Sequence, residues 1–430
     1  MIEKVVEGKF LIDGKIIHCC VGIERGIIVD VKKSLDGETR IRFPRGLILP
    51  SAVDVHVHLR DPGLTHKEDF STGTLSAAFG GVSCVIDMPN TKPPTVDKES
   101  CKEKISIGER KSYVDFGIYL GVNENNLKNL KDFEDLVTGF KIYLPDFDVT
   151  LLGELSKLKV KKVLAFHAEE RKCIEKFGKK AENLIEHAKT RASVCEKMAV
   201  EKVLKEMEKT DLRIHFCHIS SSISLYALSR FKKKVSVGVT PHHLLFKASR
   251  SLTPQSYYKV NPPLRTSLDQ EALWEALLSG EIDIIESDHA PHTMDEKEVD
   301  FSEAPSGVPG VETMYPVMLY VFLMKGYPLE RLVSALCSRP ARLFGLKKGR
   351  IAKGMDADFI VVDLKKMKKI RADRLHYKCG WTPFEGMKGI FPTDLFIRGE
   401  RIIEDEELIG DRGFGKFVKP REGEESCMEK

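Results

Sequence analysis

Short apolar runs rich in β-branched residues alternate with amphipathic stretches through the middle of the chain. Each run is short enough to be a buried strand, and the stretches between several of them have helical spacing. This alternation predicts an α/β fold with a parallel sheet. The predicted strands are Leu47–His58, Val82–Met88, Phe116–Leu120, Phe140–Tyr143, Val163–His167, Ile214–His218, Val235–Thr240 and Ile282–Asp288. Helices are expected over Glu68–Phe79, Lys98–Lys111, Ala181–Lys209 and Ser267–Leu278.

The two ends of the chain carry a different pattern. The N-terminal part has short strand-like runs and turn signals such as Asp13-Gly14, without a long helical period. Strand-like runs return near the C-terminus, for example at Asp358–Val362. We expect residues 1–50 and 345–430 to form one composite β-sandwich domain, and residues 51–344 to form the α/β domain.

Side chains that can bind a metal recur where the predicted strands end. Asp54, His56 and His58 alternate along the first strand, which places them on one face. Two imidazoles at this spacing can reach one metal ion, and imidazole favours zinc. Three later strands end at or beside a residue of the same kind, namely His167, His218 and Asp288, and another ends near Lys141. Active sites of (β/α)8 barrels are built at the C-terminal ends of the strands, so this placement favours a (β/α)8 TIM barrel over a doubly wound sheet.

Composition excludes several classes of function. The 68 Lys+Arg and 64 Asp+Glu residues leave a formal net charge of +4 on 430 residues. This balance gives no broad basic surface for nucleic acid or an anionic membrane. No stretch is apolar and long enough to span a bilayer, and the N-terminus lacks a signal-peptide core. The ten cysteines have no framework spacing, which favours reduced thiols and a cytoplasmic protein.

Six segments, found in order along the chain, resemble the dihydroorotase family of the cyclic amidohydrolases, within the amidohydrolase superfamily. The similarity covers about Leu49 to Leu364 and is looser at both ends. A single Asp-x-His-x-His segment would be weak, but six ordered segments are specific. They are Asp54–Gly63, Lys67–Gly73, Asp87–Thr95, Val260–Arg265, Ser287–Thr293 and Pro305–Thr313.

The resemblance implies a barrel of the metal-dependent hydrolase type with two zinc ions per subunit. The first ion would be held by His56, His58 and Asp288, the second by His167 and His218, with a carboxylated Lys141 and a hydroxide bridging both. An unmodified ammonium would repel a dication, whereas the carbamate that CO₂ forms with lysine is an anionic, bidentate ligand. Asp288 would also act as the general acid and base.

The reaction implied is the reversible cyclisation of N-carbamoyl-L-aspartate to L-dihydroorotate and water, the third step of de novo pyrimidine (UMP) synthesis. The substrate carries a carboxylate outside the reacting ring, which the Arg60 guanidinium would bind bidentately. Asn90 and His292 would complete that pocket. The ring amides would be held by Asn261 and by backbone groups near Pro309 and Gly310.

The same residues have simpler interpretations. Arg60 could form a surface ion pair with Asp61, and Lys141 could pair with Asp146 or Asp148. The His242-His243 pair is interpreted as structural because the ligand positions are already filled. We also interpret His18, His66, His187 and His376 as surface residues.

Three functions compete on these features. An allantoinase would usually carry Asn in place of Arg60, and a hydantoinase would lack the Arg60–Gly63 segment. A non-catalytic scaffold would have lost metal ligands, and none of the expected ligand positions is lost here. Some dihydroorotases carry aspartate in place of the lysine and depend on aspartate carbamoyltransferase, so Lys141 favours a self-sufficient centre. The resemblance is compatible with a homodimer and with association with aspartate carbamoyltransferase. It also leads us to expect a closing loop over the substrate at Leu144–Thr150.

Overall fold

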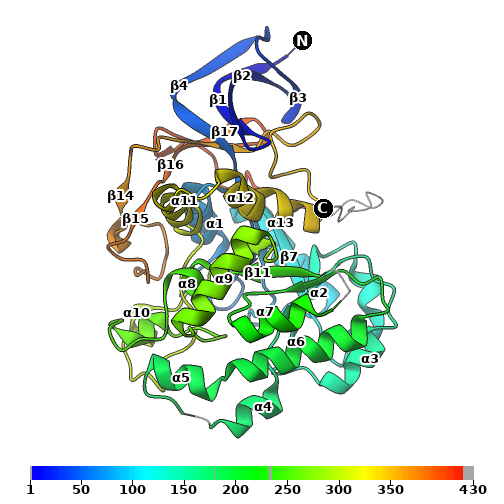
Figure 1. Cartoon of the computed structure of the whole chain (residues 1–430). Coiled ribbons are helices and arrows are strands. Elements are labelled where there is room, and N and C mark those ends of the chain that lie inside the picture. The colour runs from blue at the N-terminus through cyan, green and yellow to red at the C-terminus, as the bar shows by residue number, and fades with distance from the viewer. Residues whose placement is uncertain (1, 179, 232–234, 420–430) are drawn as a thin grey trace.

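A computed structural model describes residues 2–178, 180–231 and 235–419 of the chain (Figure 1). One of its sheets has eight parallel strands in the order β12-β11-β10-β9-β8-β7-β6-β5. Their bounds are β5 Ala52–Val57, β6 Val82–Asp87, β7 Asp115–Gly121, β8 Gly139–Tyr143, β9 Val163–His167, β10 Ile214–Phe216, β11 Ser236–Val239 and β12 Ile284–Ile285.

The two outer strands of this sheet meet and close the barrel. Val57 at the end of β5 forms a parallel bridge with His289, and the backbone N–H of His58 donates to the His289 carbonyl at 2.7 Å. The predicted TIM barrel is therefore confirmed, and each of its strands lies on one of the predicted runs. One run, Leu47–His58, contains two strands, because β4 (Thr39–Pro50) belongs to the second sheet and β5 begins at Ala52.

Helices connect and cover the strands. Their bounds are α1 Phe70–Phe79, α2 Lys98–Lys111, α3 Leu152–Leu155, α4 Arg171–Lys176, α5 Leu184–Thr190, α6 Ser193–Met207, α7 Ser222–Ser229, α8 Pro241–Leu245, α9 Ser267–Ser279, α10 Met294–Lys297, α11 Met314–Lys325, α12 Leu329–Val333 and α13 Arg339–Leu343. 3₁₀ segments lie at Leu127–Phe133, which is kinked at Asn129, and at Val149–Leu151, Gln255–Tyr258 and Ala372–Arg374, and a π turn lies at Ser334–Ser338.

Local sequence signals explain where the predicted helices begin and end. Asp97 forms a capping box with Ser100 at the start of α2, and Thr266 forms one with Asp269 at the start of α9. The helix predicted over Ala181–Lys209 is wrong as one element. It breaks at Arg191, which leaves helical geometry between α5 and α6 (φ −113°, ψ 60°).

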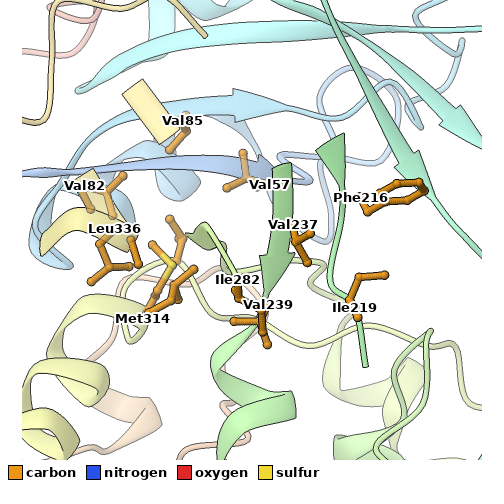
Figure 2. Packing of buried hydrophobic residues seen from close by; sticks show 14 of the residues in the cluster. Val57, Val82, Val85, Phe216, Ile219, Val237, Val239, Ile282, Met314 and Leu336 are labelled. Atoms are coloured by element: carbon orange, nitrogen blue, oxygen red, sulfur yellow. The ribbon is translucent and has the colours of Figure 1, made fainter. Parts of the chain in front are cut away.

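The core has two layers. The larger apolar cluster joins strand residues such as Phe216 and Val237 to helix residues such as Met314, and so lies between the barrel and its helices (Figure 2). A smaller cluster combines Val53 and Val55 with residues of the other strands, such as Tyr119, and with the end of α13. We place this second cluster inside the barrel, because its members alternate along the strands with those of the first cluster.

Both ends of the chain contribute to the second sheet, which lies above the barrel in Figure 1. Its order is β18-β17-β16-β13-β4-β1-β2-β3. The strands are β1 Lys4–Ile12, β2 Lys15–Glu24, β3 Ile27–Lys32, β4, β13 Phe359–Val362, β16 Pro392–Ile397, β17 Glu400–Glu404 and β18 Glu407–Leu408. A separate β-rich domain is thus confirmed, while the limits 1–50, 51–344 and 345–430 stay a prediction.

Part of the C-terminal region reaches the barrel itself. The two-stranded ribbon of β14 (Lys368–Lys369) and β15 (Lys388–Gly389) packs on α11. Between these strands, the Trp381 indole N–H donates to the His292 carbonyl at 2.7 Å. The region therefore supports the loop that carries His292.

The expectation that all cysteines are reduced is wrong for one pair. A disulfide joins Cys173 of α4 to Cys195 of α6, with 5.3 Å between their Cα atoms. Sequence spacing could not show this pairing, because it depends on the contact between the two helices. Seven other cysteines among the described residues are free and buried.

The described residues contain no helix with both the length and the apolar character of a membrane span.

Candidate metal centre and substrate pocket

Asp288, just after β12, lies beside two histidines, His56 of β5 and His58, which directly follows that strand. Its Oδ1 atom lies 3.2 Å from Nε2 of His56 and 3.2 Å from Nε2 of His58. The potential ligand atoms of His56, His218 and Asp288 all lie within 4.8 Å of one another. One carboxylate and several imidazoles therefore converge at the C-terminal edge of the barrel.

His167 and His218 form the other half of this cluster. Nδ1 of His167, the last residue of β9, lies 3.2 Å from Nε2 of His218. The ring of His218 also lies 5.0 Å from the ring of His56, centroid to centroid. His218 thus stands between the two halves of the cluster.

Lys141 of β8 is buried beside these rings. Its Nζ atom lies 3.1 Å from the sulfur of Cys217, the residue before His218. The alternative partners are engaged elsewhere, since Asp146 pairs with Arg171 and Asp148 caps a 3₁₀ turn. The surface ion pair considered for Lys141 is therefore not formed.

Buried carboxylates hold the backbone of the ligand residues. Glu286 accepts the backbone N–H of His218 at 2.6 Å and contacts His215 Nε2 at 3.2 Å. Asp54 accepts the backbone N–H groups of Ser287 at 3.1 Å and His56 at 3.2 Å. Asp54 therefore stabilises the backbone next to the ligand residues and is not itself part of the ligand cluster.

Three residues of the site have left-handed backbone geometry, which is uncommon for side chains other than glycine. The φ angles are 36° for His218, 45° for Asp288 and 61° for Arg60. Such conformations persist where the surrounding structure enforces them, and they gather at functional sites.

The donor set fits a zinc centre. Zinc takes neutral imidazoles and carboxylates, so its ligands must be deprotonated. Burial lowers the pKa of His58 to about 4, and burial together with the His167 charge holds the pKa of His218 well below its usual value. Burial raises the pKa of Asp288, but the charge of His56, whose own pKa Asp288 raises to about 10 against the effect of burial, outweighs it and holds the Asp288 pKa well below its usual value.

Arg60 is buried close enough to this cluster for its charge to act on His58 and Asp288. Its Nη2 atom lies 3.4 Å from Nε2 of His292. Asp61 pairs with Lys111 at 2.7 Å, so the surface pair considered for Arg60 and Asp61 is not formed. The structure therefore brings together Arg60 and His292, two of the residues that the sequence predicts to bind a carboxylate.

Asn90 touches both parts of the site. Its Oδ1 atom lies 2.6 Å from Nδ1 of His58. This contact places the His58 proton on Nδ1 and leaves Nε2 facing Asp288. The amide N–H₂ of Asn90 is then the group that can face a ligand.

Lys67 is a residue of this pocket that the sequence interpretation missed. Its Nζ atom lies 3.1 Å from Nδ1 of His292 and 2.7 Å from a Glu296 oxygen. An ammonium only donates, so Nδ1 accepts and the His292 proton lies on Nε2, 3.1 Å from the Ser306 carbonyl. Burial, then the charges of Arg60 and Lys67, lower the pKa of His292 to about 3. Lys67 belongs to one of the six ordered segments, which was the available signal.

The remaining predicted substrate residues border the same region. Asn261 Oδ1 lies 3.0 Å from Nε2 of His187, so His187 is buried rather than at the surface as expected. The Gly310 N–H donates to Nδ1 of His289 at 3.1 Å, which ties the Pro309-Gly310 segment to the barrel. The contacts of these groups with substrate stay a prediction.

The His242-His243 pair lies in α8, just after β11, and is buried, as a structural role requires. His243 contacts the Thr240 hydroxyl at 2.7 Å and the Pro262 carbonyl at 3.0 Å. In the expected closing loop, Leu144 and Phe147 are buried, and the loop's part in closure stays a prediction.

A barrel with imidazoles and carboxylates at the C-terminal edge of its strands is typical of metal-dependent hydrolases. A model of this class, described as "Amidohydrolase family", matches residues 47–402. The chain therefore belongs to the amidohydrolase family.

Similar proteins are known by sequence and by structure. The dihydroorotase of Methanosarcina acetivorans is 39% identical over 425 residues, covering 92% of this chain and 91% of that protein. The dihydroorotase of Thermoplasma volcanium is 38% identical over 430 residues, covering 97% of this chain and 98% of that protein. The solved L-hydantoinase (dihydropyrimidinase) of Arthrobacter aurescens has a TM-score of 0.91 at 28% identity, covering 97% of this chain and 100% of its own.

Proposed function

We propose that this protein is a zinc-dependent dihydroorotase, which interconverts N-carbamoyl-L-aspartate and L-dihydroorotate plus water in the third step of de novo pyrimidine synthesis. The observation that carries this proposal is the position of Arg60 and His292 beside the His58–Asp288 pair. A carboxylate-binding pocket thus adjoins a hydrolytic metal site. Similarity to dihydroorotases over nearly the full chain supports the same activity.

We assign the first zinc ion to His56, His58 and Asp288 and the second to His167 and His218, with carboxylated Lys141 between them. The assignment is supported by the convergence of these side chains and by the buried position of Lys141. When bound, the two ions would supply Lewis-acid polarisation of the amide carbonyl and a water of lowered pKa.

Asp288 carries the proton in both directions. In ring opening, water adds to the amide carbonyl carbon, the C–N bond breaks, and the Asp288 carboxylate accepts the proton of the water and delivers it to the leaving nitrogen. In ring closure, the ureido nitrogen attacks the carbon of the protonated carboxyl group, and Asp288 takes the proton of that nitrogen and delivers it to the carboxyl hydroxyl, which leaves as water. The lowered pKa of Asp288 means that its carboxylate is ionised at neutral pH, which is the form that this role requires.

The pocket distinguishes this activity from that of the hydantoinases. Arg60 supplies a planar donor pair for the carboxylate outside the ring, and His292, whose Nε2–H faces the Ser306 carbonyl, lies beside the guanidinium. Asn90 contributes an amide donor from the metal side. Hydantoin and dihydrouracil have no such carboxylate, so this buried guanidinium would have no partner on them. We also propose a cytoplasmic location, with a small dianionic molecule rather than a nucleic acid or a membrane as the binding partner.

Replacing Arg60 with methionine should lower kcat/KM for N-carbamoyl-L-aspartate about 10- to 150-fold, which corresponds to about 1.5–3 kcal/mol for a lost charge-assisted contact. The zinc content should stay that of the unmodified protein, because Arg60 is not among the proposed ligands. Steady-state kinetics and metal analysis of the same preparation measure both quantities.

The matched control for this variant is Arg42→Met in β4, where an exposed guanidinium pairs with Glu7. This control should leave both quantities unchanged. If Arg60→Met loses zinc in proportion to its loss of activity, Arg60 has a structural role instead.

A further inference from the structure

A buried ion pair lies directly behind His167. Arg191 donates to both oxygens of Glu169, with Nε 3.1 Å from Oε1 and Nη2 2.5 Å from Oε2. The same Oε2 atom lies 2.8 Å from Nε2 of His167. Glu169 is fully buried, and the Arg191 side chain is 16% exposed. The three side chains form a chain that ends at a proposed metal ligand.

This chain decides which nitrogen His167 presents. An ionised carboxylate only accepts hydrogen bonds, so Nε2 of His167 must carry the proton. Nδ1 then has the free lone pair, and it is Nδ1 that faces Nε2 of His218 at 3.2 Å. Partners of this kind fix the tautomer and the ring orientation of metal-binding histidines.

Arg191 reaches Glu169 because the helical region is broken at this residue. Arg191 lies between α5 and α6 and has non-helical backbone angles, so neither helix sets the direction of its side chain. The Tyr143 ring packs on His167, with its centroid 4.5 Å from that of the imidazole. Tyr143 also interacts with Arg191, so His167 is held by an aromatic ring and by the Glu169–Arg191 pair together.

The disulfide joins the two segments that carry this ion pair. Cys173 lies four residues after Glu169, and Cys195 lies four residues after Arg191. The backbone N–H of Glu170 also donates to the Cys195 carbonyl at 3.1 Å. A covalent link at this place restrains the Arg191 segment against the segment that follows β9.

We propose that Arg191 is a positioning residue that acts through Glu169 to present Nδ1 of His167 to the second metal ion, and that the Cys173–Cys195 disulfide holds Arg191 in this position. This inference rests on the proposed binuclear zinc centre. It assigns to Arg191, Glu169 and the disulfide a role in metal affinity without direct contact with metal or substrate.

The test is zinc retention by full-length Arg191→Met. After dialysis against buffer of fixed free zinc, the unmodified protein should keep about two ions per chain. The affinity of the variant for its second ion should fall about 10- to 100-fold, while the first ion is retained. Arg191→Lys should show a smaller loss, because lysine supplies the charge without the planar donor pair.

The matched control is Lys202→Met. Lys202 lies on α6 and pairs with Glu170 at 3.0 Å, so its loss removes a similar contact from the adjacent carboxylate. Both zinc ions should be held as in the unmodified protein. Far-UV circular dichroism and thermal unfolding show which variants are folded, and Arg191→Lys provides the milder test if Arg191→Met is not.

The disulfide is tested with the double variant Cys173→Ser/Cys195→Ser, with Cys101→Ser, a free buried thiol of α2, as its control. The double variant should lose affinity for the second ion, by less than Arg191→Met. Unchanged affinity in folded Arg191 variants would overturn the positioning role, and unchanged affinity in the double variant would overturn the role of the disulfide. A single bound ion in the unmodified protein would instead contradict the proposed binuclear centre.

Discussion

Replacing Lys141 with alanine should reduce dihydroorotate hydrolysis about a thousandfold or more and lower the zinc content from about two ions per chain. Lys141 is buried next to Cys217, and its carbamate is the proposed bridge between two sets of histidines. Alanine leaves that position without a ligand, so the carbonyl polarisation and the activated water are lost together. Metal analysis and turnover of the same sample measure the effect.

The control for this variant is Lys98→Ala, which removes an exposed lysine at the start of α2. It should keep full activity and full zinc content. Activity retained in Lys141→Ala with two bound ions would show that Lys141 is not the bridge.

Replacing Asp288 with asparagine should lower kcat by a factor of about 10²–10⁴, the usual contribution of a general acid and base. Asparagine has nearly the same shape but cannot accept a proton from water or deliver it to the ring nitrogen. The charge of His56 holds the pKa of Asp288 well below its usual value against the effect of burial. In the unmodified protein the carboxylate is therefore present at neutral pH, and its contribution to ring opening is lost as the pH drops through that lowered pKa.

Steady-state kinetics over a range of pH check this prediction. The fall in rate that accompanies protonation of Asp288 should be absent from the residual activity of Asp288→Asn. The exposed Asp373, which pairs with Arg371, provides the control Asp373→Asn with unchanged kcat. A kcat of Asp288→Asn within a few-fold of the unmodified value would assign the proton transfer to another group.

The barrel and the ligand cluster could be predicted from sequence because parallel strands end at one edge. Residues that end different predicted strands, such as His167 and His218, must then lie close together. Alternation along β5 predicted less exactly which of its residues share a face. Val53 and Val55 pack inside the barrel, and β5 changes its register with β6 near Asp54 and Val57. This irregularity separates Asp54 from the ligand cluster that His56 and His58 join.

Features that depend on contacts between distant segments could not be predicted. The Cys173–Cys195 disulfide and the Arg191–Glu169 pair both require the packing of α4 against α6. A helical period that continues on both sides of Arg191 gave no sign that the chain leaves helical geometry there. The segment that contains Lys67 was recognised in the sequence. The contact of Lys67 with His292, however, is visible only in the folded structure.

The central claim, dihydroorotase activity, is tested most directly by a side-by-side assay of the purified, zinc-loaded protein. Its substrates are dihydroorotate, allantoin, hydantoin and dihydrouracil. The account predicts the highest kcat/KM for dihydroorotate, with ring closure of N-carbamoyl-L-aspartate favoured at lower pH because it consumes a proton. A higher kcat/KM for allantoin, hydantoin or dihydrouracil would contradict it.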